Sequence, residues 1–205
     1  MNSAAADIEI VPATVEDARH VAGLIATAFD PLEAARWQIG DDDLRRALFP
    51  GMFMDYVEHA TVEGNVEITT DLSAAALWLV ESGETKPAPP PPTGRLATAL
   101  GPWAENVHAF DLALHAAEPT GTPFEKLTIL AVRPGRQRQG LGSALLAYHL
   151  AGLDRRLVPA YLEASSKASR ELYRRFGFDD LGGPITLPDG VLLHPMWREP
   201  AGIAR

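Results

Sequence analysis

A glycine-rich loop that follows an apolar run is the part of this sequence best suited to chemistry. Residues 127–146 read LTILAVRPGRQRQGLGSALL, an apolar run, a polar loop with three arginines, and Gly-Leu-Gly opening an amphipathic helix. The first backbone N–H groups of a helix lack internal partners, and the helix dipole adds positive charge there. Gly140 and Gly142 remove the Cβ atoms that would keep a ligand from these groups. The spacing therefore predicts a phosphate-binding loop, best suited to a pyrophosphate.

Two common nucleotide-binding patterns fit this loop less well. A P-loop needs Gly-x4-Gly-Lys-Ser/Thr, and although Gly135 and Gly140 have that separation, Leu141 occupies the lysine position. A dinucleotide-binding fold needs G-x-G-x-x-G/A directly after its strand and an acidic residue about 20 positions later. Glu163 could be that residue, but Leu145 replaces the third glycine and a polar loop intervenes.

The loop resembles the acetyl-CoA-binding loop of the GCN5-related N-acetyltransferases (GNAT). Residues 137–142, QRQGLG, fit the family pattern Q/R-x-x-G-x-G/A, and Val-Arg-Pro precedes them as it does in the family. A second motif follows in the right order: YLEAS at 161–165, then ELYRRFGF at 171–178, which is similar to the family helix ending in L-Y-x-x-x-G-F. The Ala-Ala-Leu-Trp strand and Pro-Met-Trp ending also moderately resemble puromycin-type small-molecule N-acetyltransferases.

This resemblance implies an α/β (α+β) fold with one N-acetyltransferase domain over residues 1–205. Its central sheet would be mixed but mostly antiparallel, would contain one splayed parallel strand pair, and would be flanked by helices. The cofactor and catalytic motifs would lie within residues 127–178, and residues 81–94 would form a proline-rich loop.

The resemblance also implies which residues bind acetyl-CoA. The pantetheine arm would pair with the backbone of the strand before the loop, at Leu130, Ala131 and Val132. The pyrophosphate would lie on the loop and the first helical turn, whose residues are Arg136, Gln137, Arg138, Gln139, Gly140, Leu141, Gly142 and Ser143. Whether the Arg136 and Arg138 side chains contact phosphate or only solvent is left open.

The implied reaction is direct attack of an amine on the thioester, without a metal. An amine is mostly protonated at neutral pH, so a base or a water chain must remove a proton. Glu163 is the best acidic candidate for that base, with binding of the amine as its alternative. Tyr173 matches the family position of the general acid that protonates the leaving thiolate. His115 is left open between a substrate contact and a packed residue, whereas His149 is expected to be structural.

Composition restricts the remaining classes. A chain of 205 residues suits one domain, and 46% hydrophobic with 22% charged residues is typical of a soluble globular protein. The absence of cysteine excludes disulfides, thiolate metal sites and cysteine nucleophiles, and the histidines lack metal-ligand spacing. A net charge of -9 argues against nucleic acid as a partner and is compatible with a cationic amine.

Location and assembly are predicted less directly. The longest apolar run, residues 74–80, is too short to span a membrane, so no membrane partner is expected. The N-terminus, MNSAAADIEI, lacks the basic segment of a secretory signal, which predicts a cytoplasmic protein. A monomer and a homodimer are equally compatible with the sequence.

Periodicity and turn residues predict an alternation of strands and helices around the motifs. The expected elements before the loop are a strand at 8–11, a helix starting at Thr14 with Asp17 completing a capping box, a helix at 41–59 broken or kinked at Pro50-Gly51, a hairpin of 66–70 and 74–80, a helix at 96–117 and a strand at 124–132. After it are expected a helix at 140–154, a strand at 160–164, a helix at 166–176, and two strands at 179–186 and 191–197 joined at 187–190.

The sequence thus favours an N-acetyltransferase that acts on a primary amine of a small molecule. A protein N-terminal or lysine acetyltransferase is the alternative within the same chemistry. A non-catalytic acyl-CoA-binding module is the alternative from another class, and the presence of Tyr173 argues against it.

Overall fold

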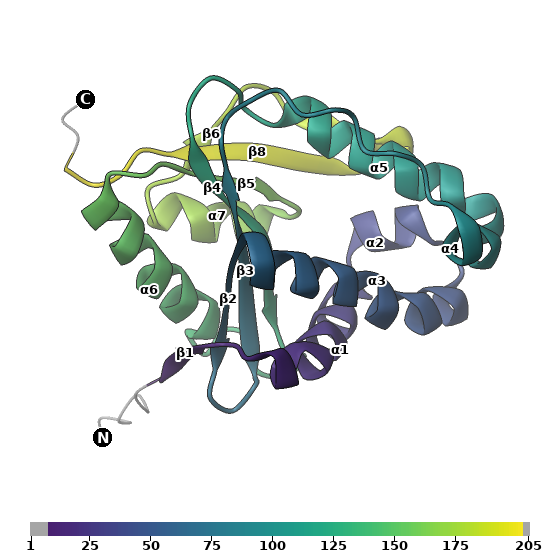
Figure 1. The fold of residues 1–205 in the computed structure, drawn as a ribbon, viewed down its shortest axis with the longest axis horizontal. Coiled ribbons are helices and arrows are strands. Elements are labelled where there is room, and N and C mark those ends of the chain that lie inside the picture. The colour runs from purple at the N-terminus through teal and green to yellow at the C-terminus, as the bar shows by residue number, and fades with distance from the viewer. Residues whose placement is uncertain (1–7, 203–205) are drawn as a thin grey trace.

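An eight-stranded sheet runs through the molecule and separates two groups of helices (Figure 1). The computed structural model describes residues 8–202, so most of the segment used to judge a secretory signal lies outside the described residues. The strand order is β1-β2-β3-β4-β5-β8-β6, with β7 also paired to β8. The strands are β1 (Ile10–Pro12), β2 (Gly64–Thr69), β3 (Ala74–Glu81), β4 (Phe124–Val132), β5 (Ala160–Ala164), β6 (Asp179–Asp180), β7 (Ile185–Thr186) and β8 (Leu192–Arg198).

The two faces of the sheet carry different helices. The helices are α1 (Ala18–Phe29), α2 (Glu33–Gln38), α3 (Asp42–Glu63), α4 (Gly94–Leu100), α5 (Ala104–Ala117), α6 (Leu141–Arg156) and α7 (Lys167–Arg175). Alternate residues of β3 divide between two cores, because successive strand side chains point to opposite faces. Ala76 and Trp78 pack with α6, whereas Ala75 and Leu77 pack with α1 and α3. Figure 1 shows α6 on one side of the sheet and α1 and α3 on the other.

Strands β4 and β5 form the parallel pair that the sequence predicts, and they separate soon after they meet. They pair only from Glu125 to Leu127 of β4, although β4 continues to Val132. At the same point the β3–β4 register shifts, so that Thr128 is an extra residue on β4. An extra residue of this kind bends its strand and increases the local twist. The bulge therefore coincides with the place where β4 leaves β5. Every other strand pair within residues 8–202 is antiparallel.

The helix predicted at 41–59 forms as α3, which is not broken at Pro50 and continues to Glu63. The Asp41 side chain accepts a hydrogen bond from the Leu44 N–H at 2.9 Å and so caps the first turn. Phe49 and Val57 are buried against the neighbouring helices and strands. Packing of this apolar face outweighs the hydrogen bond that proline removes.

The helix predicted at 96–117 is divided in the structure. A short 3-10 turn at Gly101–Trp103 separates α4 from α5, and Gly101 has a φ of 54° that continues neither helix. The α2 helix was not predicted at all. Toward the C-terminus the strand predicted at 179–186 is two short strands, β6 and β7, and a 3-10 turn at Pro188–Gly190 joins β7 to β8.

Within residues 8–202, none of the helices is both long enough and apolar enough to cross a bilayer.

Candidate active site

A cleft of about 710 Å³ opens where β4 and β5 separate. One end, here called the loop end, is lined by the loop before α6 and the first turn of that helix. The other end, called the helix end, is lined by side chains from α1 to α5. The predicted site residues that line this cleft are Leu130, Val132, Arg136, Gln137, Arg138, Gly140, Leu141, Gly142, Ser143, Glu163 and Tyr173. The cleft therefore brings together most of the sequence-predicted site.

The first turn of α6 presents backbone N–H groups at the loop end. Gly140 precedes the helix with a φ of 86°, a left-handed conformation that suits glycine, and no side chain caps this helix. A Cβ atom on Gly142 would lie 3.6 Å from Leu130 Cδ2 and 3.7 Å from Val132 Cγ2. A larger side chain there would therefore have to extend into the cleft or displace its wall. These features fit an anion held on the helix N-terminus.

The two glutamines of the loop hold its shape. The Gln137 side chain accepts a hydrogen bond from the Gly135 N–H at 2.8 Å and donates one to the Val132 carbonyl at 3.4 Å. The Gln139 side chain accepts one from Arg136 Nε at 3.0 Å, and Gln139 does not line the cleft. Gln139 could therefore contact the cofactor only through its backbone.

The two candidate phosphate-binding arginines are held differently. Arg136 forms an ion pair with Asp71 at 3.2 Å in addition to its bond with Gln139. Arg138 has a φ of 62°, and within the described part of the chain it forms no ion pair. Of the two side chains, that of Arg138 is the one free to approach a ligand.

The unpaired part of β4 forms one wall of the cleft. Leu130 and Val132 line it, whereas Ala131 is buried in the core on the opposite face, beside α1 and α3. Alternation along the strand thus leaves only the backbone of Ala131 available at the cleft. Thr128, the bulged residue, also lines the cleft, and its hydroxyl is buried without a hydrogen-bond partner among residues 8–202.

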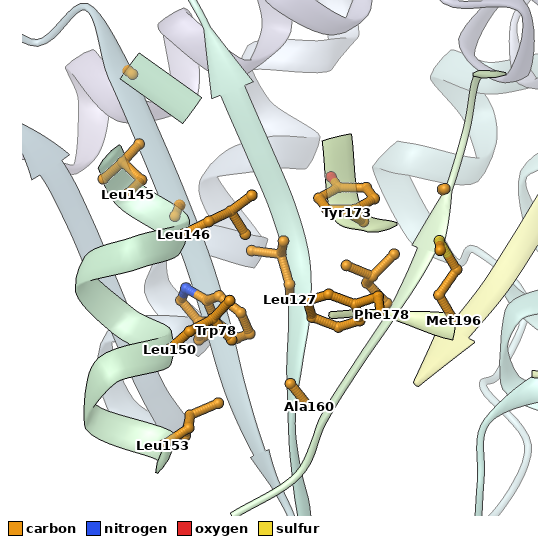
Figure 2. Close-up of a cluster of buried hydrophobic side chains, with 14 of the residues drawn as sticks. Trp78, Leu127, Leu145, Leu146, Leu150, Leu153, Ala160, Tyr173, Phe178 and Met196 are labelled. Carbon is orange, nitrogen blue, oxygen red and sulfur yellow. The ribbon is translucent and has the colours of Figure 1, made fainter. Parts of the chain in front are cut away.

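Tyr173 lies on the α6 side of the sheet at the edge of this cleft. Its ring packs edge-to-face on Phe178, with centroids 5.9 Å apart. The hydroxyl oxygen points away from Phe178 (Figure 2), and it has no hydrogen-bond partner in the described structure. Burial raises the pKa of the phenol above its usual value. Tyr173 is thus a protonated hydroxyl facing the cleft, and the structure shows no backbone bond that would give it a purely structural role.

Glu163 reaches the cleft from β5 on the face opposite Tyr173. Leu162 and Ala164 belong to the core beside α6, so the alternation of the strand turns Glu163 toward α1–α5. Its Oε1 lies 3.0 Å from Lys126 Nζ, and the same ammonium lies 3.2 Å from Glu118. Burial alone would lower the pKa of Lys126, but the two carboxylates raise it. The charge of Glu163 is therefore balanced by a buried lysine.

Comparisons with known proteins agree with this geometry. The family model "Acetyltransferase (GNAT) domain" matches residues 105–180, which include the glycine loop, Glu163 and Tyr173. The structure of histone acetyltransferase HPA2 and related acetyltransferase from Corynebacterium glutamicum aligns with a TM-score of 0.68 and 25% identity, covering 95% of this chain and 97% of that one. Residues 105–180 therefore match the GNAT domain, within a fold that the chain shares with this acetyltransferase over nearly its whole length.

Two other matches give the range of this GNAT resemblance. The tRNA(Met) cytidine acetyltransferase TmcA of Citrobacter koseri is 33% identical over 123 residues, which cover 54% of this chain and only 16% of that protein. Arylalkylamine N-acetyltransferase 2 of Aedes aegypti is similar in fold, with a TM-score of 0.65 at 14% identity over 95% of this chain and 99% of that one. The chain therefore shares its fold with solved acetyltransferases and spans only a small part of the cytidine acetyltransferase that it matches in sequence.

The helix end of the cleft contains residues that were not predicted from the sequence. Tyr56 of α3 and Asp111 of α5 both line it. Burial raises the pKa of Asp111 to about 6, which attraction to His108 offsets only in part. One signal was present in the sequence: Asp111 interrupts the apolar helical stripe of Val107, Phe110 and Leu114.

His115 and His149 do not line this cleft. His115 lines a separate, smaller polar hollow with Lys86 and Glu118. His149 is buried on the side of α6 that packs against the sheet, where its two ring nitrogens lie 2.7 Å from Glu67 and 2.7 Å from Glu125. Its ring stacks on Trp78 with centroids 4.0 Å apart. These contacts agree with the structural role expected for His149.

Proposed function

We propose that this GNAT protein transfers the acetyl group of acetyl-CoA to a primary amine of a small molecule. The observation that carries the proposal is that one cleft is lined by the uncapped N-terminus of α6, the unpaired edge of β4 and the unbonded hydroxyl of Tyr173. Each feature suits one part of the reaction: a pyrophosphate, an extended amide-bearing arm and a departing thiolate.

The residues present at the loop end fit acetyl-CoA. The N–H groups of Leu141, Gly142 and Ser143 and the side chain of Arg138 would hold the phosphates. The backbone of β4 beyond Leu127 has no β5 partner, so it would pair with the pantetheine amides. When bound, acetyl-CoA supplies an acyl group activated as a thioester.

The chain supplies the two proton transfers of the reaction. Glu163, directly or through a water, would take the proton that the amine loses as the new N–C bond forms. Tyr173 would donate its proton to the sulfur as the C–S bond breaks, and would regain one from solvent. Glu163 and Tyr173 come from opposite faces of the sheet and line the same cleft. This arrangement suits one acid and one base acting on the two ends of one reacting group.

The proline-rich segment favours a small acceptor over a macromolecule. Pro90 and Pro92 line the cleft, so the end of this segment nearest to α4 forms part of its wall. A protein or tRNA acceptor would need an open groove at this position.

The decisive experiment is to measure acetyl-CoA binding by calorimetry and CoA release with a panel of amines. Binding together with amine-dependent CoA release would support the proposal. Binding without transfer to any amine would instead favour a non-catalytic acyl-CoA-binding module, and transfer only to peptides or RNA would favour a macromolecular acceptor.

A further inference from the structure

Aromatic side chains are concentrated at the helix end of the cleft. Four of the seven phenylalanines of the protein line it: Phe29, Phe49, Phe53 and Phe110. The ring centroid of Phe53 lies 5.4 Å from that of Phe29 and 5.1 Å from that of Phe49, both edge-to-face. Phe29, Phe53 and Phe110 are only partly buried, although they come from helices that face one another. Such a lining favours a ligand with a substantial apolar group.

The charged side chains at this end are acidic, and among the described residues only one of them is both partly buried and without a counter-ion. Asp55, Asp111 and Glu163 all line the cleft. Glu163 is balanced by Lys126, and Asp55 is exposed. Asp111 is partly buried and has no hydrogen bond or ion pair within residues 8–202, apart from the longer-range attraction of His108 on its own helix.

The groups around Asp111 do not supply a compensating positive charge. Tyr56 on α3 also lines the cleft, and nearby carboxylates, first among them Asp111, contribute to raising the pKa of this phenol. The arginines of the cleft belong to the loop before α6 and to α7, not to α1–α5. A sheltered carboxylate without a partner lowers stability, so its presence in a cleft points to a function.

We propose that the acceptor is a monoamine carrying one positive charge and an aromatic or extended hydrocarbon group, and that Asp111 binds its ammonium. This inference rests on the acetyl transfer proposed above. One unbalanced carboxylate matches one ammonium, and the phenylalanine-lined wall accommodates the apolar group. A second cationic group would have to enter that apolar wall without a partner. A free amino acid would place its carboxylate near Asp111 and Glu163, which repel it.

The first test compares amines that differ in one feature, with the wild-type protein at saturating acetyl-CoA. Along n-butylamine, n-hexylamine and n-octylamine, kcat/KM for CoA release should rise about three-fold per methylene until the apolar wall is covered. n-Pentylamine and 1,4-diaminobutane have the same length, but the far end of the chain is a methyl group in the first and a second ammonium in the other. The diamine should react about ten-fold less efficiently or worse.

The outcomes of this test separate the two proposals. A preference for 1,4-diaminobutane, or a rate independent of chain length, would overturn the proposal of an apolar monoamine acceptor. Either result would still demonstrate acetyl transfer. Acetyl-CoA binding with transfer to none of these amines would also overturn it. Failure to bind acetyl-CoA would instead overturn the proposed function itself.

The second test asks whether Asp111 is the amine-binding group. Asp111→Asn should lower kcat/KM for n-pentylamine about 100-fold, mainly through KM, because a charge-assisted contact is lost. The affinity for acetyl-CoA should not change. Glu105→Gln is the matched control, because Glu105 is exposed on the same helix and does not line the cleft.

Thermal stability gives an independent readout of the same variant. The folded-state pKa of Asp111 is raised from 3.8 to about 6, so its ionised form costs stability above that pH. Asp111→Asn should therefore raise the thermal midpoint at pH 7.5 by roughly 2–4 °C while it weakens binding of the amine. A lowered midpoint with an unchanged KM would show that Asp111 is structural and would overturn its assignment.

Discussion

At the scale of single residues, the protein holds its candidate acid and base in different ways. Tyr173 is fixed by packing on Phe178, and its hydroxyl has no partner among the described residues. Glu163 is fixed by an ion pair with Lys126. Packing therefore leaves the phenol proton available, whereas the ion pair holds the carboxylate in place at the cleft. This difference makes Tyr173 the sharper target for mutation.

Replacing Tyr173 by Phe should slow the reaction without weakening the binding of acetyl-CoA. The change deletes only the hydroxyl, so the contact with Phe178 remains. We expect kcat to fall by about 10²-fold or more, within the range for positioned acid catalysis. The dissociation constant of acetyl-CoA, measured by calorimetry, should stay nearly the same, because a general acid acts only as the thiolate leaves. Full activity with a clearly lowered melting temperature would assign Tyr173 a structural role.

The residue scale also shows which parts of the site could not be predicted from sequence. Gly140, Gly142 and Tyr173 belong to short motifs whose spacing alone indicates a loop and a helix end. Lys126 and Asp111 do not belong to such motifs, because the role of Lys126 depends on partners from other elements and that of Asp111 on its place in the cleft. Lys126 meets Glu118 and Glu163 only after β4 and β5 pair.

At the scale of elements, sequence patterns predict the order of strands and helices better than their irregularities. The hairpin of β2 and β3 and the β4–loop–α6 unit form much as expected. The bulge at Thr128 was not predicted, because it depends on the register between two strands rather than on local residue types. The continuity of α3 through Pro50 was also missed, because burial of one face decides it.

The N-terminus of α6 makes a prediction at this scale. Gly142→Val should weaken acetyl-CoA binding severely, by about 100-fold or more, because two γ-carbons would extend from a Cβ already in contact with Leu130 and Val132. Calorimetry measures the affinity, and circular dichroism checks that the variant is folded. Gly152→Val, in the same helix and away from the cleft, is the control for valine in α6. An unchanged affinity in folded Gly142→Val would remove the helix N-terminus from the binding site.

A second prediction concerns the loop before α6 and distinguishes the roles of its two arginines. Arg138→Ala should lower acetyl-CoA affinity about ten-fold and flatten its dependence on salt, since a charge that faces phosphate is screened by ions. Arg136→Ala should have the smaller effect on affinity, because Arg136 is paired with Asp71. Titrations at low and high salt would measure both quantities. Equal and negligible effects would mean that both arginines are solvated loop residues.

At the scale of the whole molecule, one buried polar cluster joins the helix layer to the sheet. His149 of α6 lies between Glu67 of β2 and Glu125 of β4, and Arg156 lies 2.7 Å from Glu125. Burial would lower the pKa of His149, but the hydrogen bonds to the two carboxylates outweigh it and raise that pKa. The imidazole is therefore expected to be charged in the folded protein at pH values where it is neutral in the unfolded chain.

This cluster predicts how stability depends on pH. Because the folded-state pKa of His149 lies above its unfolded value, its contribution is fully present below about pH 6.5 and is lost as pH rises through the folded-state pKa. His149→Gln leaves two carboxylates without a cation between them, so it should cost about 3–5 kcal/mol at pH 6. The gap between wild type and variant should narrow toward pH 9. Urea unfolding at several pH values measures this gap, with His59→Gln, an exposed histidine of α3, as control. A constant gap between pH 6 and pH 9 would mean that His149 stabilises the layers by packing on Trp78 and not by its charge.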